Sequence, residues 1–135
     1  MPGDVSPHFL LHEFGLSDEK ARKRGLDAGA EYPAEWIESR LKPLCAALEV
    51  IRAEFGGKPV RIVSAYRPLE YNRKIGSEDD SQHVQGRAAD FQIDGVDPGV
   101  IWERMIKLQH VGRLDIGGAG DPIELDWVRL YRRAG

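Results

Sequence analysis

The chain has 135 residues, of which 41% are hydrophobic and 30% charged, and its net charge at neutral pH is −3. These values are typical of one globular domain, and an acidic balance argues against a dedicated nucleic-acid-binding surface. The single cysteine, Cys45, excludes a framework of internal disulfides. No apolar run reaches the roughly 20 residues of a membrane-spanning helix, and the first residues lack the features of a secretory signal peptide, so we expect cytoplasmic synthesis.

We expect one domain over residues 1–135, with an N-terminal arm in 1–30 and a core in 31–135. In the arm, Ser17 suits a helix N-cap, and the charged segment after it predicts a short exposed helix that ends before Gly25. From Pro33 to Phe55, apolar residues recur at steps of three and four, which predicts a helix with one buried stripe. Pro43 should kink this helix or divide it in two, because proline lacks an N–H and clashes one turn back.

The second half of the chain is predicted to form most of a sheet. Residues 60–66 and 86–93 have the composition of strands, and a short helix over 69–75 and an acidic loop over 76–82 separate them. A helix is predicted over 98–110, because Asp97 suits an N-cap and a proline follows it. Two further strands are predicted at 111–116 and 125–131, on either side of a glycine-rich turn at 117–122. This order predicts an α+β fold, with a small, mainly antiparallel sheet packed against the N-terminal helices.

The segment 81–90, Ser-Gln-His-Val-Gln-Gly-Arg-Ala-Ala-Asp, carries the residues best suited to chemistry. It places the imidazole of His83 and the carboxylate of Asp90 seven residues apart, and both groups are common zinc ligands. Gly86 lies between them and tolerates the sharp turn that would bring them together. Alone, this spacing is more often found in two unrelated surface residues.

With its flanking segments, the motif resembles the M15 zinc peptidases, and more narrowly their D-Ala-D-Ala carboxypeptidase-like branch, which is common in bacteria and phage lytic proteins. The resemblance rests on Ser-Ala-Tyr-Arg-Pro at 64–68, on Asn72 and Gly76, and on the segment 81–90. It implies the hedgehog/D-Ala-D-Ala peptidase-like fold and a zinc ion that activates water to cleave a peptidoglycan stem peptide.

The resemblance also implies roles for individual residues. His83 and Asp90 would be metal ligands, and Arg67 would bind the terminal carboxylate of the substrate, a task suited to a guanidinium. Ser81 would form a hydrogen bond near the metal. Asp126 would be the catalytic acid and base.

The C-terminal strand departs from the family pattern, because Arg129 occurs where a third zinc ligand, a histidine, is expected. An arginine keeps its proton and cannot ligate zinc. The nearby candidates for a replacement are His110, Asp115 and Asp126, but Asp126 could not be both ligand and general base.

Two hypotheses therefore remain open. The first is a zinc-dependent peptidoglycan peptidase with an altered third ligand. The second is a catalytically inactive protein that uses the fold as a structural or cell-wall-binding component, for example together with other proteins of a phage particle. In the second hypothesis His83 and Asp90 form a hydrogen-bonded pair, and Arg129 pairs with an acidic neighbour.

Overall fold

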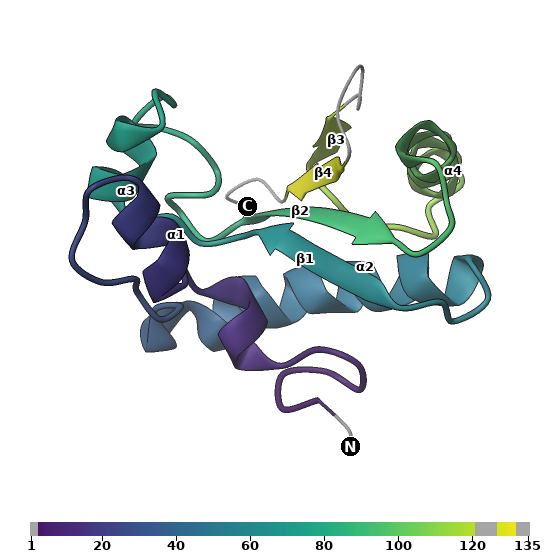
Figure 1. Ribbon diagram of the computed structural model, residues 1–135. Coiled ribbons are helices and arrows are strands. Elements are labelled where there is room, and N and C mark those ends of the chain that lie inside the picture. The colour runs from purple at the N-terminus through teal and green to yellow at the C-terminus, as the bar shows by residue number, and fades with distance from the viewer. Residues whose placement is uncertain (1–2, 121–126, 132–135) are drawn as a thin grey trace.

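The computed structural model describes residues 3–120 and 127–131. The helices and helical turns are η1 (Leu11–Phe14), α1 (Asp18–Lys23), η2 (Ala34–Trp36), η3 (Ile37–Leu41), α2 (Lys42–Glu54), α3 (Leu69–Lys74) and α4 (Pro98–His110). The strands are β1 (Val60–Ser64), β2 (Ala88–Ile93), β3 (Gly118–Gly120) and β4 (Val128–Tyr131). They form one antiparallel sheet in the order β1-β2-β4-β3 (Figure 1). The predicted α+β fold with a small antiparallel sheet is confirmed.

The core lies between the sheet and α2, which runs along β1 and β2 (Figure 1). Leu44, Cys45, Leu48 and Ile51 recur on one side of α2 and are fully buried, as their spacing predicts. Strand β2 has neighbours on both sides, and five of its six residues are buried. The strand that carries Asp90 is therefore held in place by the centre of the core.

The helix predicted over 33–55 is present but irregular in its first third. A 3₁₀ turn, η2, leads into a π-helical turn, η3, and regular α-helix begins only at Lys42. Pro43 is the second residue of α2, where its missing N–H is not needed for the regular hydrogen-bond pattern. The predicted break at Pro43 is thus a change of helix type.

The prediction of a strand at 111–116 is wrong. Val111 caps the end of α4, and residues 114–116 have no regular structure, although Leu114 and Ile116 are buried. Their alternating burial comes from packing against the core and not from strand pairing. The strand that pairs with β4 is instead β3, which lies inside the predicted turn at 117–122. A Cβ on Gly118 would lie 2.3 Å from the Tyr131 hydroxyl, so a larger residue there would displace the Tyr131 side chain.

The other predicted elements are present with shorter ends. Strand β1 stops at Ser64 instead of residue 66, β2 starts at Ala88 instead of residue 86, and α3 ends at Lys74. Ser17 and Asp97 cap α1 and α4 through their side chains, as predicted. No helix in the described part of the chain is long and apolar enough to cross a membrane.

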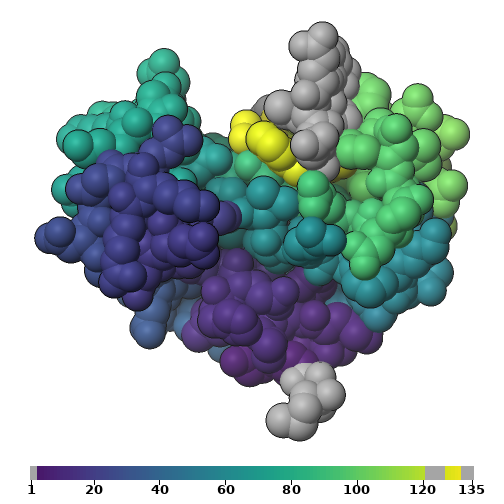
Figure 2. Space-filling view, viewed as in Figure 1, coloured from purple at the N-terminus to yellow at the C-terminus, as the bar shows by residue number. Residues whose placement is uncertain are grey.

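The N-terminal arm packs along the outer side of β1. Phe9 and Phe14 enter the same core as α2 and the sheet, and their rings meet edge to face with centroids 6.0 Å apart. The Phe14 carbonyl accepts a hydrogen bond of 3.0 Å from the Tyr66 N–H, just beyond β1. Figure 2 shows a hollow in the surface where the purple arm, the dark-blue region of α1 and the teal β1 meet.

Candidate site around Asp90

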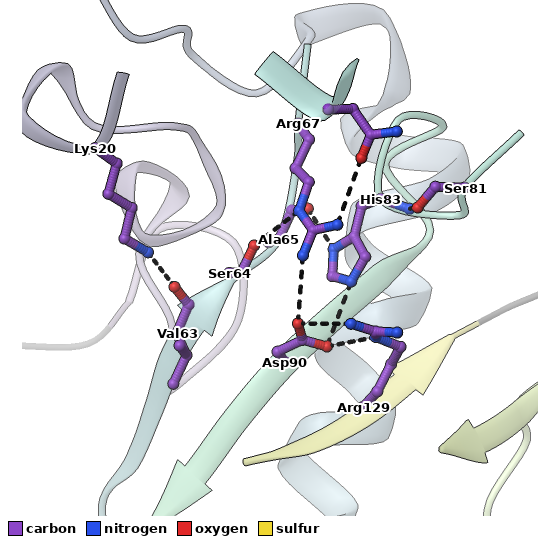
Figure 3. Close-up of polar contacts among 10 residues, drawn as sticks. Lys20, Val63, Ser64, Ala65, Arg67, Ser81, His83, Asp90 and Arg129 are labelled. Atoms are coloured by element: carbon purple, nitrogen blue, oxygen red, sulfur yellow. Dashed lines mark hydrogen bonds and ion pairs between the residues drawn. The ribbon is translucent and has the colours of Figure 1, made fainter. Parts of the chain in front are cut away.

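Four of the five predicted site residues lie close together in space (Figure 3). Arg67 follows β1, Ser81 and His83 lie in the loop before β2, and Asp90 is on β2. The fifth, Asp126, lies outside the described residues, so its predicted role as acid and base stays a prediction.

The His83 side chain is buried, and its orientation is fixed from several directions. Ring atom Nδ1 lies 2.7 Å from the Ala65 carbonyl, which can only accept, so Nδ1 carries the proton of this hydrogen bond. The His83 N–H donates to the Ser81 hydroxyl (3.2 Å), and its carbonyl accepts from the Arg67 N–H (3.1 Å). Ser81 thus positions the histidine backbone. Nε2 is left facing Asp90, 3.3 Å from its Oδ1.

Gly86 allows the backbone of the loop to turn sharply just after His83. Its φ of +69° is unfavourable for other residues, and its N–H donates to the His83 carbonyl (3.2 Å). The Tyr32 hydroxyl donates to the Gly86 carbonyl at 2.6 Å. A Cβ at this position would lie 2.7 Å from that hydroxyl and 2.9 Å from the Trp36 ring. Both the backbone conformation and the space therefore require glycine.

Asp90 and Arg129 form the central ion pair of the site. They are directly opposite each other in the β2–β4 register, which places both side chains on the same face of the sheet. Arg129 Nε lies 2.7 Å from Oδ1 of Asp90, and the terminal nitrogen Nη2 lies 3.2 Å from Oδ2. The guanidinium therefore contacts both carboxylate oxygens, the geometry of a strong charge-assisted pair.

This environment keeps Asp90 ionised although its side chain is only 2% exposed. Burial alone would raise the pKa of Asp90, but its polar contacts, the ion pair with Arg129 among them, outweigh that effect and hold the pKa below its ordinary value. The carboxylate is thus a fixed negative charge at neutral pH.

A second guanidinium contacts this carboxylate, and the ammonium group of Lys20 interacts with it through its charge. The Arg67 guanidinium lies 3.6 Å from Oδ2 of Asp90 and also donates to the Ser64 hydroxyl (3.3 Å) and the Asn72 side-chain oxygen (3.4 Å). Lys20 donates through Nζ to the Val63 carbonyl. Burial and the positive charge of Arg67 lower the pKa of Lys20, whereas Asp90 opposes the shift. We call Lys20, Arg67 and Arg129 the cation cluster.

The sequence did not indicate Lys20 or assign a role to Asn72. Lys20 belongs to a segment that reads as an exposed charged helix, and only the packing of the arm on β1 brings it to the site. Asn72 is buried and donates to the Glu78 carbonyl at 2.7 Å, so it links α3 to the acidic loop and to Arg67. Asn72 is part of the motif that carries the family resemblance, and this was the available signal.

The donors around Asp90 do not fit a three-ligand catalytic zinc site. Among the described residues, no three His, Cys, Asp or Glu side chains lie close enough together to hold a metal ion. Arg129 engages both oxygens of Asp90, and its fixed positive charge opposes a divalent cation in the same place. One feature favours a metal: within the described residues, Nε2 of His83 has no hydrogen-bond partner of acceptable geometry despite its burial.

One comparison with known proteins, that with family models, agrees with the resemblance seen in the motif. A comparison with curated proteins gave no match. The family described as Peptidase M15 matches residues 7–123, which include Arg67, His83 and Asp90. The match ends before β4, so Arg129 lies beyond it. Since the match spans most of the chain, the protein belongs to the peptidase M15 family.

Proposed function

We propose that this protein is a non-hydrolytic member of the M15 family that binds peptidoglycan stem peptides through their carboxylates, as a structural or cell-wall-binding component, for example of a phage particle. The observation that carries the proposal is the ion pair of Arg129 with both oxygens of Asp90. A guanidinium in this position occupies the carboxylate that a catalytic metal would need.

The charge balance of the site supports the binding of an anion. The cation cluster contributes three positive charges, and within the described residues Arg67 and Arg129 share one carboxylate, that of Asp90. Partly buried charges without counter-charges are unfavourable, and a carboxylate ligand would supply one. The side chain of Arg129 is 43% exposed, so its outer face is available to a ligand while its other face holds Asp90.

The test is to measure binding and cleavage of one synthetic stem pentapeptide side by side. We expect isothermal titration calorimetry to detect binding that weakens with added salt, because the contact is ionic. Mass spectrometry of the same mixture, with zinc added, should find only intact peptide. Arg129→Gln should weaken binding, whereas Arg61→Gln should not, because Arg61 is exposed on β1 and pairs with Asp94. Release of D-alanine or of a shorter peptide by the wild-type protein, absent in His83→Ala, would overturn the proposal.

The second candidate is a zinc-dependent peptidoglycan peptidase, and the buried Nε2 of His83 favours it. This atom carries a lone pair in the neutral ring and faces the negatively charged Asp90, an arrangement that a cation between them would stabilise. The two candidates differ in metal content. Zinc that co-purifies at about one ion per chain and is lost in His83→Ala would favour the peptidase.

A further inference from the structure

We propose that an extended peptide binds along the free edge of β1, with its terminal carboxylate at the cation cluster and an amino group among the acidic residues of the adjoining cavity. The inference deepens the proposed function and rests on it, because the same stem peptide would be the ligand. It adds a second binding region and an orientation for that peptide.

The binding region is a cavity of about 650 Å³ between β1 and the N-terminal arm. Ile62, Val63 and Ser64 form its β1 side, and residues within 11–20 and 29–32 form most of the rest. The hollow between the arm, α1 and β1 in Figure 2 marks this region. Its volume lies within the range of about 300–1,000 Å³ that is usual for small-ligand sites.

Strand β1 offers backbone hydrogen bonds on this side, because it is an edge strand with β2 as its neighbour. The Pro59 carbonyl accepts from the Asp94 N–H, and Val60 is opposite Ile93 in the register. Backbone groups alternate in direction along an antiparallel strand, so those of Val60 and Ile62 point away from β2. Within the described residues, no backbone hydrogen bond outside the sheet involves the N–H or carbonyl groups of Val60 and Ile62. An extended peptide can pair with such an edge.

The cavity adjoins the cation cluster at one end. Ser64 and Lys20 both line it, and the Ser64 hydroxyl accepts a hydrogen bond from Arg67. A register shift of β1 lies between Ile62 and Ser64, and the Val63 carbonyl there accepts from Lys20. Lys20 thus occupies the Val63 carbonyl, at the end of the free edge of β1 that is nearest to Asp90. A peptide lying along β1 would bring its carboxylate to this end.

The remainder of the lining has the opposite charge. It contains four carboxylates, those of Asp4, Glu13, Asp18 and Glu31. Asp4, Glu13 and Asp18 each use one oxygen to accept a backbone N–H of the arm, which holds them in place. A ligand complementary to both parts carries a free carboxylate and a free amine. A stem peptide with a diamino acid before its terminal residues has this chemistry, and a peptide without a free amine does not.

The first experiment compares three forms of one stem pentapeptide that contains a diamino acid: the free acid, the C-terminal amide, and the free acid with its side-chain amine acetylated. We expect the amide to bind at least about tenfold more weakly, because it loses a charge-assisted pair. We expect the acetylated peptide to bind about threefold to tenfold more weakly. Hydrogen exchange with the free-acid peptide should show new protection of the Ile62 N–H.

Paired variants test the same contacts from the protein side. Lys20→Met should weaken binding of the free acid, whereas Lys23→Met on the same helix should not, because Lys23 is exposed and pairs with Glu19. Glu31→Gln should reduce the preference for the free amine, and Glu35→Gln, which is exposed and outside the cavity lining, should leave it unchanged. Unchanged circular dichroism spectra establish that each variant folds.

The outcomes separate the two proposals. If the peptide binds intact but acetylation and Glu31→Gln have no effect and Ile62 gains no protection, the β1 site is wrong and the proposed function stands. If the peptide is cleaved and Ile62 is protected, the proposed function is wrong and the β1 site stands. Absence of binding to any of the three peptides overturns both.

Discussion

Replacing Arg129 by histidine separates the role of the guanidinium from that of a metal. In the β2–β4 register Asp90 and Arg129 are directly opposite, so their Cα atoms are about 4.5–5.5 Å apart. An imidazole at this position would reach the region between His83 and Asp90. Arg129→His should therefore remove the internal cation and add the third ligand that the described residues do not provide.

The loss of stability without metal can be worked out from the contacts. Removing one partner of a buried ion pair costs about 3–5 kcal/mol. Arg129 is 43% exposed, and Arg67 stays 3.6 Å from Asp90, so the cost is reduced. We expect a loss of about 2–3 kcal/mol, which lowers Tm by about 8–12 °C for a domain of this size. Arg129→Gln should lose a similar amount.

The assay is thermal unfolding of the wild type, Arg129→His and Arg129→Gln, each with zinc and with a chelator. A ligand at 100 times its Kd stabilises a protein by about 2.7 kcal/mol, so zinc should restore most of the stability of Arg129→His. Zinc should not stabilise Arg129→Gln or the wild type. Equal zinc effects on all three proteins, or none on Arg129→His, would refute the view that Arg129 takes the place of a metal.

Three further predictions concern the rest of the site. The pKa of Asp90 is lower in the folded protein than in the unfolded chain. Its contribution to stability is therefore present above its unfolded pKa of about 3.9 and is lost as pH falls through the lower folded value. When the free energy of unfolding is measured against pH in acid, it should fall more steeply for the wild type than for Asp90→Asn. In urea unfolding, Gly86→Ala should lower the free energy of unfolding by about 2–4 kcal/mol and Gly76→Ala by about 1 kcal/mol. Both glycines have positive φ, but only at Gly86 would an added Cβ clash with neighbouring atoms. Equal losses would contradict the packing at Tyr32. Asn72→Ala should cost about 1–3 kcal/mol, because the Glu78 carbonyl loses its donor, and hydrogen exchange should accelerate in the loop 76–82.

Local sequence patterns predicted the helices well, because their signals lie within a few residues. The caps at Ser17 and Asp97 and the buried stripe of α2 depend on nearby positions alone. The strand error at 111–116 has a different origin. Leu114 and Ile116 alternate in burial as strand residues do, but pairing depends on which segment meets β4, and that is decided by tertiary packing.

The site, too, has residues that the sequence predicts and residues that only tertiary packing brings in. His83, Asp90 and Arg67 were predicted from their motif, and the pairing of Arg129 with an acidic neighbour was one of two open hypotheses; the structure brings Arg129 onto Asp90. Lys20 could not be predicted, because it contacts Val63 across 43 residues of sequence, and no periodicity in its own helix indicates that contact. Asp126 lies outside the described residues, and its role stays a prediction.

The zinc content of the wild-type protein tests the central claim most directly. The protein would be purified without chelator, incubated with excess zinc, dialysed, and measured by elemental analysis. If the Arg129 guanidinium holds Asp90 in place of a metal, the content should be below about 0.1 zinc per chain, since a competing fixed cation opposes binding. A content near one zinc per chain would contradict the claim.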